Sequence, residues 1–479
     1  MTTDSFIPES KTARAPAEAV RFLLPGFVGA AVVVAAAVEP LAPLAAASAV
    51  VLLVAWFYRR DWLLGGVFLF LIFQNLIYQQ LLPMQASVAG WVKHADDLLM
   101  VFFVLALAGE TVFPRLRLNQ VPLWRPFGLW LAICLLSSVC NHLTPKETTI
   151  GTYLLLKDFI WFFLAASVRL DERGYRHVLR FLLVVLGAIL AFGFFQFVTG
   201  DLTYRWLGLP ADYRFGIARL RSVFIHPVYM AEAMALLAIL AVSAYIEFRN
   251  PLHLALAAGT LAAVGLTMLV KTMIALGLAV GLLLVRKRPW LVVPYAVAAV
   301  VAMVGFSEYG TENLRRQFST YIESPRSVRR EGYRISSEIL RESPLLGAGP
   351  GMFGGYAALV LDSPVAGRHG FINYDMQDYS TVDAYWPHLA GEIGLAGLLA
   401  YGWLLWSAGR ASWRTSVRAA TSPQQRVLAM TAAIFLLVAA IEAFASANLE
   451  DTLCGFMIFS LLGLTQGDPL SGDVGQPSE

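Results

Sequence analysis

Long apolar runs recur along this chain, and they constrain its fold more than any other feature. A helix needs about 17 to 25 apolar residues to cross the hydrocarbon layer of a membrane, and about fourteen runs come close to that length. They extend over residues 22–38, 41–58, 62–82, 96–113, 124–143, 151–168, 178–199, 227–246, 252–269, 271–285, 290–306, 385–407, 427–446 and 451–465. Only 14% of the residues are charged and 58% are hydrophobic, which is far from the composition of a soluble globular protein. The sequence therefore predicts an all-α polytopic membrane protein with about 12 to 14 transmembrane helices.

Lysine and arginine residues indicate the orientation of these helices, because cytoplasmic loops carry an excess of positive charge. Alternate connections hold basic groups such as Arg59 with Arg60, Arg115 with Arg117, and Arg286 with Arg288. This pattern predicts that both termini are cytoplasmic. It divides the chain into N-terminal helices at 1–306 with an outer loop at 201–226, a large outer loop at 307–384, C-terminal helices at 385–465, and a tail at 466–479.

The two outer loops break the charge rule because both are rich in arginine. The first holds Arg205, Arg214, Arg219 and Arg221, and the second holds Arg315, Arg316, Arg326, Arg329, Arg330, Arg334, Arg341 and Arg368. One reading is that a long loop is translocated whatever its charge. The other is that the planar guanidinium group, which donates parallel hydrogen bonds, holds a phosphate or a carboxylate outside the membrane. The short length of the first loop favours the second reading there.

Within the second loop, a helix is predicted to begin with Ser324 as N-cap and Pro325 in its first position, and to end at Glu342. Arginines then recur along one face of this helix, namely Arg326, Arg330, Arg334 and Arg341. Like charges on one face repel each other unless an anion or carboxylates lie opposite. The stripe favours an anion site, with a solvated face as the alternative.

A glycine-rich segment follows Pro344 and contains Gly347, Gly349, Gly351 and Gly354. It partly matches a nucleotide-binding loop, but no buried strand precedes it. Tight turns and close approach of the backbone explain these glycines better.

Three motifs follow one another along the chain. The first is Arg219-Leu-Arg221-Ser-Val-Phe-Ile-His226-Pro227, which opens an apolar run. The second is the Pro-Leu-Leu-Gly-x-Gly-x-Gly turn at 344–351, and the third is Glu-x-Gly-x-x-Gly at 392–397. Together, and in this order, they resemble the superfamily of O-antigen ligases and Wzy-type O-antigen and exopolysaccharide polymerases.

This resemblance implies a GT-C-like fold with a large, partly helical periplasmic loop, in the bacterial inner membrane. It implies transfer of a glycan from an undecaprenyl diphosphate carrier to an acceptor hydroxyl, with inversion at the anomeric carbon and without a metal or another cofactor. The positions that match the family's diphosphate-binding arginines are Arg219 and Arg221, then Arg329 or Arg330 together with Arg334, and Lys271. Supporting candidates are Lys157, His226, Arg326, His388 and Glu392.

The residue that activates the acceptor departs from the family's pattern. Ligases have a histidine nine residues before the glutamate of the third motif, and that position is Asp383 here. His388 would point to a different side if both residues lay on one helix. A carboxylate that hydrogen bonds the acceptor hydroxyl can take its proton, so Asp383 is the predicted base. The alternative is that Asp383 caps the following helix.

Because the ligase histidine is absent, the sequence favours a polymerase that joins lipid-diphosphate-linked repeat units into a surface polysaccharide. A ligase that delivers glycan to lipid A core or to protein is one alternative. A flippase of lipid-linked oligosaccharide is another, since Lys157 and Asp158 lie inside a predicted span, where charges are usually paired or functional. For Lys157, contact with a phosphate and pairing with a carboxylate are equally open. Expected partners are the lipid-linked donor and acceptor, membrane lipid and, as candidates, chain-length regulator or export proteins, with no nucleic acid.

Overall fold

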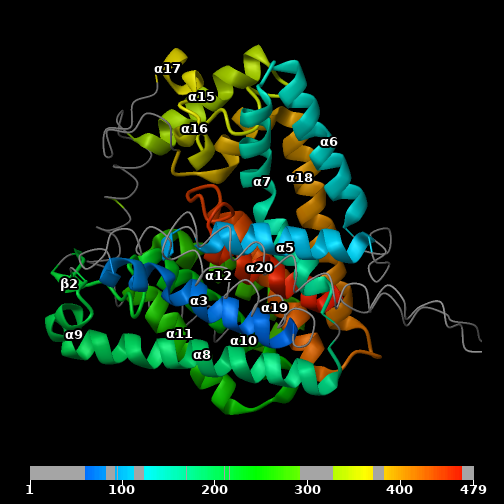
Figure 1. The fold of residues 1–479 in the computed structure, drawn as a ribbon. Coiled ribbons are helices and arrows are strands. Elements are labelled where there is room, and N and C mark those ends of the chain that lie inside the picture. Colours follow the sequence, from blue (N-terminus) through cyan, green and yellow to red (C-terminus); the bar gives the residue numbers. More distant parts are fainter. Residues whose placement is uncertain are drawn as a thin grey trace, which may run out of the picture. The chain divides into compact units, whose positions relative to one another are not determined.

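The computed structural model describes residues 60–81, 92–93, 95–112, 123–168, 170–209, 211–214, 216–287, 289–291, 315, 327–370 and 382–466. The chain forms two units, Met1–Gly66 and Val67–Glu479. The first unit is described only at residues 60–66, where helix α3 begins. The second unit is mostly helical (Figure 1).

The apolar helices overlap the predicted runs, with ends that differ by up to ten residues. They are α3 (Arg60–Leu81), α5 (Ala95–Val112), α6 (Trp124–Cys140), α7 (Pro145–Ala166), α8 (Glu172–Thr199), α10 (Pro227–Phe248), α11 (Pro251–Leu266), α12 (Val270–Lys287), α18 (Tyr385–Val417), α19 (Pro423–Glu442) and α20 (Thr452–Gln466). Among the described residues, six helices are long and apolar enough to cross a membrane: α3, α7, α8, α10, α18 and α19. The chain is therefore a multi-pass membrane protein.

The described residues contain fewer membrane spans than the roughly fourteen that the sequence predicts for the whole chain. Helices α6, α11, α12 and α20 are apolar but shorter. The predicted runs at 22–38 and 41–58 lie outside the described residues, and so does the run at 290–306 beyond the short 3-10 helix η3 (Pro289–Leu291).

Several of these helices begin where the local sequence supplies a cap. Thr144 starts α7 with a capping box: its hydroxyl accepts the amide of Glu147, and the Glu147 carboxylate accepts the Thr144 N–H at 2.7 Å. His226, Asn250 and Ser422 cap α10, α11 and α19, and a proline follows each of them. Proline suits this position because its missing N–H would have no helical partner there.

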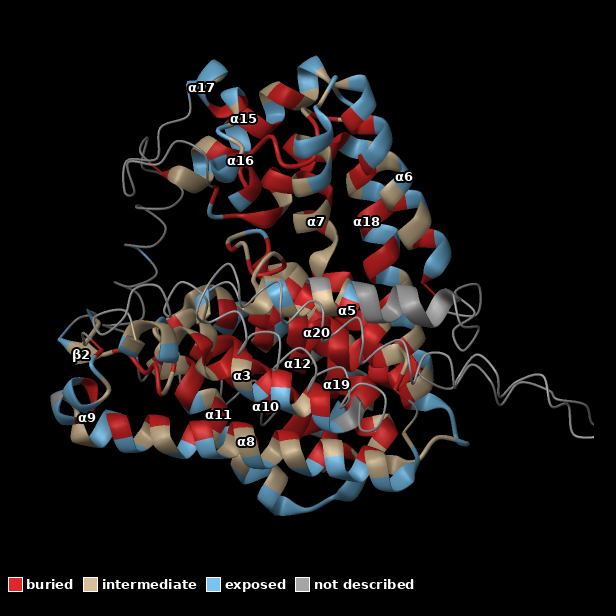
Figure 2. Ribbon diagram, in the orientation of Figure 1, coloured by how far each residue is buried: buried red, intermediate tan, exposed pale blue. Residues whose placement is uncertain are grey.

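Helix α10 lies inside the bundle and contacts α8, α11, α12, α19 and α20. Every residue from Met230 to Ala244 is buried (Figure 2). A helix that is apolar all round, as this one is, can bury every face.

Helices α12 and α18 each leave one apolar stripe exposed. The stripes consist of Ile274, Leu278, Leu282 and Val285 on α12, and of Leu395, Leu399, Trp403 and Trp406 on α18. Spacings of three and four residues place each set on one helix face. Such faces suit contact with lipid chains, which are as apolar as these side chains.

Both arginine-rich loops contain short elements. The first has α9 (Asp201–Trp206) and a hairpin of β1 (Tyr213–Arg214) and β2 (Ile217–Ala218), in which Tyr213 pairs with Ala218. The second has α15 (Val328–Glu342), α16 (Tyr356–Val360) and α17 (Pro364–Arg368). In the part of the chain that the structure describes, the all-α prediction is therefore right apart from one small hairpin.

The predicted start of the helix in the second loop is wrong. Ser327, rather than Ser324, is the N-cap of α15, and its hydroxyl accepts the Arg330 amide at 3.3 Å. A serine side chain in this position satisfies an amide that the first helical turn leaves unpaired. The end at Glu342 agrees with the prediction.

Candidate functional site

The glycine-rich segment forms a series of turns that press against membrane helices. Four of its residues have positive φ: Gly347, Gly349, Gly351 and Gly354. A Cβ atom on Gly351 would lie only 2.6 Å from the Cα of Gly151 in α7. From α6, the Ser137 hydroxyl donates to the Leu346 carbonyl at 2.6 Å. Tight turns and close backbone approach, as predicted for this segment, are confirmed.

Helix α18 is interrupted beside this segment, at Gly394, whose φ of 62° and ψ of −168° are not helical. The interruption lets backbone groups of α18 pair with the glycine-rich segment. The Leu395 amide donates to the Pro344 carbonyl at 2.9 Å, and the Gly349 amide donates to the Glu392 carbonyl at 2.8 Å. The second and third sequence motifs, which are far apart along the chain, therefore pack as one unit.

A small hydrophobic core holds the end of the second loop. It consists of Ile335, Ile339, Met352, Phe353, Val365, Ala366, Val382 and Ala384. The Val382 amide donates to the Gly354 carbonyl at 2.7 Å. On the other side, a Cβ atom on Gly332 of α15 would lie 2.3 Å from the Val382 side chain. Val382 and Ala384 are thus anchored, and the residue between them is held beside α15.

That residue is Asp383, and it pairs with Arg329. The Nε and Nη2 atoms of Arg329 donate to Oδ2 of Asp383 at 2.9 and 2.6 Å. The Asp383 side chain is 54% exposed, whereas that of Arg329 is 19% exposed. Asp383 is not the cap of α18, because the N-cap is Ala384 and no side chain bonds there. The helix begins at Tyr385, so Asp383 and His388 do not lie on one helix.

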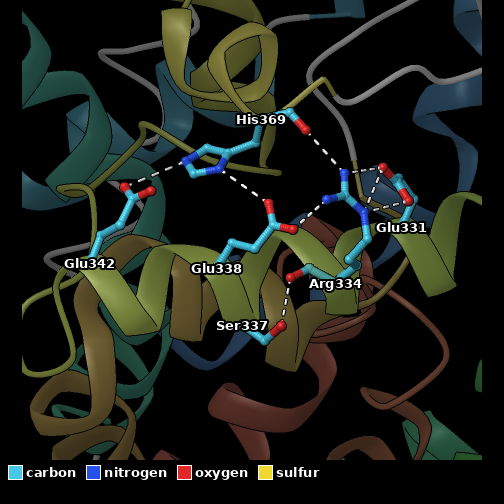
Figure 3. A network of polar contacts seen from close by, with 6 residues as sticks. All are labelled: Glu331, Arg334, Ser337, Glu338, Glu342 and His369. Carbon is cyan, nitrogen blue, oxygen red and sulfur yellow. Dashed lines mark hydrogen bonds and ion pairs between the residues drawn. The ribbon is translucent and has the colours of Figure 1, made fainter.

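Arg334 is engaged largely by its own helix (Figure 3). It donates to the carboxylates of Glu331 and Glu338 and to the His369 carbonyl. The hydrogen bond to Glu331 raises the pKa of Arg334, and Glu338 adds to this against the effect of desolvation. Carboxylates of α15 itself therefore balance this part of the arginine stripe. Arg326 lies outside the described residues.

Four basic candidates gather where the first arginine-rich loop meets α10 and α12: Arg219, Arg221, His226 and Lys271. Arg219 is buried, and its Nε donates to the Thr267 carbonyl at 2.9 Å. Its Nη1 donates to Oδ2 of Asp212, also at 2.9 Å. Arg221 is buried too, and its Nη1 donates to the Ile225 carbonyl at 2.8 Å.

The pKa of His226 reflects its partial desolvation and the positive charges around it. Its Nδ1 accepts the Val228 amide at 3.2 Å, which requires an unprotonated nitrogen. Partial desolvation, then the charges of Arg219, Lys271 and Arg221, hold the pKa of His226 below its usual range, although Asp212 opposes them. An anion placed here would meet several converging positive charges.

His388 and Glu392 are buried together with a residue that sequence reasoning missed. His388 Nε2 lies 3.2 Å from Glu392 Oε1, and His388 Nδ1 lies 3.3 Å from Oε2 of Glu450. Glu450 belongs to the connection between α19 and α20. No sequence signal identifies it, because an acidic residue just before an apolar run looks like an ordinary loop charge.

Lys157 is held by polar groups of other segments. Its Nζ donates to the Thr452 hydroxyl at 3.2 Å, and that hydroxyl donates to Asp96 at 3.1 Å. The carboxylates of Asp158 and Glu450 are near enough to interact with its charge. Of the two open readings, this environment favours pairing with carboxylates.

The connection between α19 and α20 also contacts helix α15 of the second arginine-rich loop and the start of α10. The Tyr333 hydroxyl of α15 donates to the Phe444 carbonyl at 2.8 Å. Asp451 interacts with the Tyr229 hydroxyl, which lies in the first turn of α10. Helix α15 and the first turn of α10 therefore meet the same connection.

Within the described ranges, no group of three or more His, Cys, Asp or Glu residues could hold a metal ion. Neither models of protein families nor curated proteins match this chain.

Proposed function

We propose that this protein is a membrane glycosyltransferase that polymerises lipid-diphosphate-linked repeat units on the periplasmic face of a bacterial inner membrane. The observation that carries the proposal is the contact between Arg329 and Asp383. It places an exposed carboxylate, fixed by a guanidinium group, where the arginine-rich loop joins α18. The three motifs that resemble the ligase and polymerase superfamily support the same reading.

In the proposed reaction, the acceptor hydroxyl attacks the anomeric carbon of the donor sugar, and Asp383 takes the hydroxyl proton. The bond from that carbon to the diphosphate oxygen breaks, and its electron pair leaves with the diphosphate. Arg329 orients the Asp383 carboxylate through these hydrogen bonds, so that it can accept the hydroxyl proton. Both of its described hydrogen bonds reach Oδ2, so the hydroxyl is expected at Oδ1.

The departing diphosphate is assigned to the basic group at the start of α10. Arg219 and Arg221 are anchored to backbone carbonyls, so their positive charges are preorganised. Because both side chains are buried, they are proposed to act through their fixed charges, which stabilise negative charge that develops during a reaction. Lys271 and His226 complete the group, and Arg330 and Arg334 stay candidates for a second contact on α15.

Chain length of the polysaccharide tests the proposal. In a deletion strain complemented with Asp383→Asn, we expect single repeat units and no long chains, because loss of a general base slows transfer about 10²- to 10⁴-fold. Asp362→Asn is the matched control: Asp362 is exposed in the same loop, and asparagine tolerates its φ of 50°. Both proteins must reach wild-type abundance in the membrane.

The alternatives give different products in the same experiment. If the protein is a ligase, Asp383→Asn leaves long lipid-linked chains that are absent from their terminal acceptor. If it is a flippase, single units accumulate on the cytoplasmic face. Wild-type chain lengths with Asp383→Asn would exclude Asp383 as the base.

A further inference from the structure

His388 and Glu392 form a buried charged group with the partly exposed Glu450 inside a membrane protein, where charges are costly. His388 is 2% exposed and Glu392 is 1% exposed. A substrate therefore cannot reach the imidazole ring directly. With a carboxylate oxygen 3.2 or 3.3 Å from each nitrogen, the ring is best stabilised as an imidazolium. We expect such a buried charged cluster to hold the neighbouring backbone in place.

Each carboxylate of this cluster also binds the backbone of the glycine-rich segment. Glu392 Oε1 accepts the Phe353 amide at 3.3 Å, and Glu450 Oε1 accepts the Tyr356 amide at 3.1 Å. Between these two residues, the backbone of Gly355 lies directly against the imidazole. A Cβ atom there would be 2.6 Å from the ring of His388 and 2.9 Å from Oε1 of Glu450.

One short hydrogen bond connects the glycine-rich segment to the residue that precedes Asp383. The Gly354 carbonyl accepts the Val382 amide at 2.7 Å, and Val382 directly precedes Asp383. The Val382 side chain in turn packs against Gly332, which lies one helical turn after Arg329 in α15. The position of Asp383 relative to Arg329 thus depends on where Gly354 is held.

We propose that Glu450 is a positioning residue: through the Tyr356 amide and through His388 it fixes the glycine-rich segment, and through Gly354 and Val382 it fixes the carboxylate of Asp383. The inference rests on the proposed function, since it assigns to Glu450 a part in the transfer that Asp383 performs. Glu450 acts without touching the substrate.

The charge state of Glu450 supports this role. Burial opposes its ionisation, yet the contact with His388 and the Tyr356 amide lower the pKa of Glu450 below its usual value. Glu450 is therefore ionised at neutral pH, as a residue that holds both an imidazolium ring and a backbone N–H must be.

Two variants of Glu450 separate these contacts. Glu450→Gln keeps an oxygen that can accept the Tyr356 amide but loses the charge that faces His388, and Glu450→Ala loses both. We expect kcat for polymerisation to fall about tenfold to hundredfold in Glu450→Ala, because small misplacements of a reacting group cost that much. The loss in Glu450→Gln should be smaller, and KM for the acceptor should change less than about threefold. Glu172→Gln, in an exposed pair with Arg176, is the control.

Hydrogen exchange supplies a readout that does not depend on catalysis. In Glu450→Ala, the amides of Tyr356 and Val382 should exchange faster, whereas those of α19 should keep their wild-type protection. If Glu450→Ala does not fold, Gly355→Ala tests the same contact, since its methyl group would separate the segment from His388 while all charges stay. Gly367→Ala is its control, because a Cβ atom there meets nothing within 4 Å.

The outcomes are distinct. Faster exchange at Val382 with a reduced kcat supports the proposal. Unchanged exchange at Tyr356 and Val382 overturns it, whether or not transfer is observed. Faster exchange with a wild-type kcat also overturns it, because Asp383 then functions without the contacts that Glu450 makes. Absence of polymerisation by the wild-type protein would instead contradict the proposed function.

Discussion

At the scale of residues, the structure distinguishes two adjacent arginines that the sequence left as alternatives. Arg329 donates two hydrogen bonds to Asp383, whereas the Arg330 side chain is exposed on α15. We expect Arg329→Ala to lower the rate of glycan transfer about 10²-fold, as loss of one preorganised donor typically does. Arg330→Ala should lower the rate less than Arg329→Ala does. Transfer measured in membranes and normalised to protein abundance checks this, and the reverse order would move the assignment to Arg330.

A second residue-scale prediction concerns the response of His226 to pH. Its pKa is lowered in the folded protein, so the unfolded chain binds the proton more readily. The contribution of His226 to stability is therefore fully present above its unfolded pKa of about 6.5, and it is lost as the pH falls below that value. Asparagine caps helices without titrating. The unfolding midpoint of the wild type should fall relative to that of His226→Asn between about pH 6.5 and pH 5; parallel curves would contradict the assignment.

At the scale of elements, the interruption of α18 is what joins the glycine-rich segment to the membrane helices. Gly394 has φ and ψ values that other residues adopt only with strain of about 1–3 kcal/mol. A Cβ atom there would also lie 2.4 Å from the Leu345 carbonyl. We expect Gly394→Ala to lower the thermal unfolding midpoint strongly or to prevent accumulation of the protein.

Gly402 is the matched control on the same helix, because a Cβ atom at Gly402 meets nothing within 4 Å. Gly402→Ala should leave the midpoint unchanged or raise it, since alanine is favoured over glycine within a helix by about 0.5–1 kcal/mol. Equal midpoints for both variants, measured in detergent, would mean that the interruption is not required for folding.

At the scale of the whole molecule, the placement of the loops relative to the membrane can be measured directly. The charge pattern predicts that α17 lies outside and that the connection between α18 and α19 lies inside. In a Cys140→Ser background, a thiol reagent that cannot cross the membrane should label Gly367→Cys in spheroplasts. It should label Ala420→Cys only after lysis. Cys134 and Cys454 are buried, so they give little background. Labelling of Ala420→Cys before lysis would reverse the orientation.

The sequence by itself determined the class of the protein, its helices and many of their ends. Apolar runs of membrane length, and the His226-Pro227 pair that opens one of them, are local signals, so they can be read from the sequence. The glycine-rich segment was also read correctly, because positive φ at Gly347 and Gly351 favours glycine whatever surrounds it.

Only the tertiary structure decided which polar groups meet. The contact between Arg329 and Asp383 joins residues 54 positions apart, and Glu450 reaches a histidine on another helix. Such contacts depend on how helices pack and on where Gly394 interrupts α18, and packing of distant segments leaves no periodic pattern in one sequence.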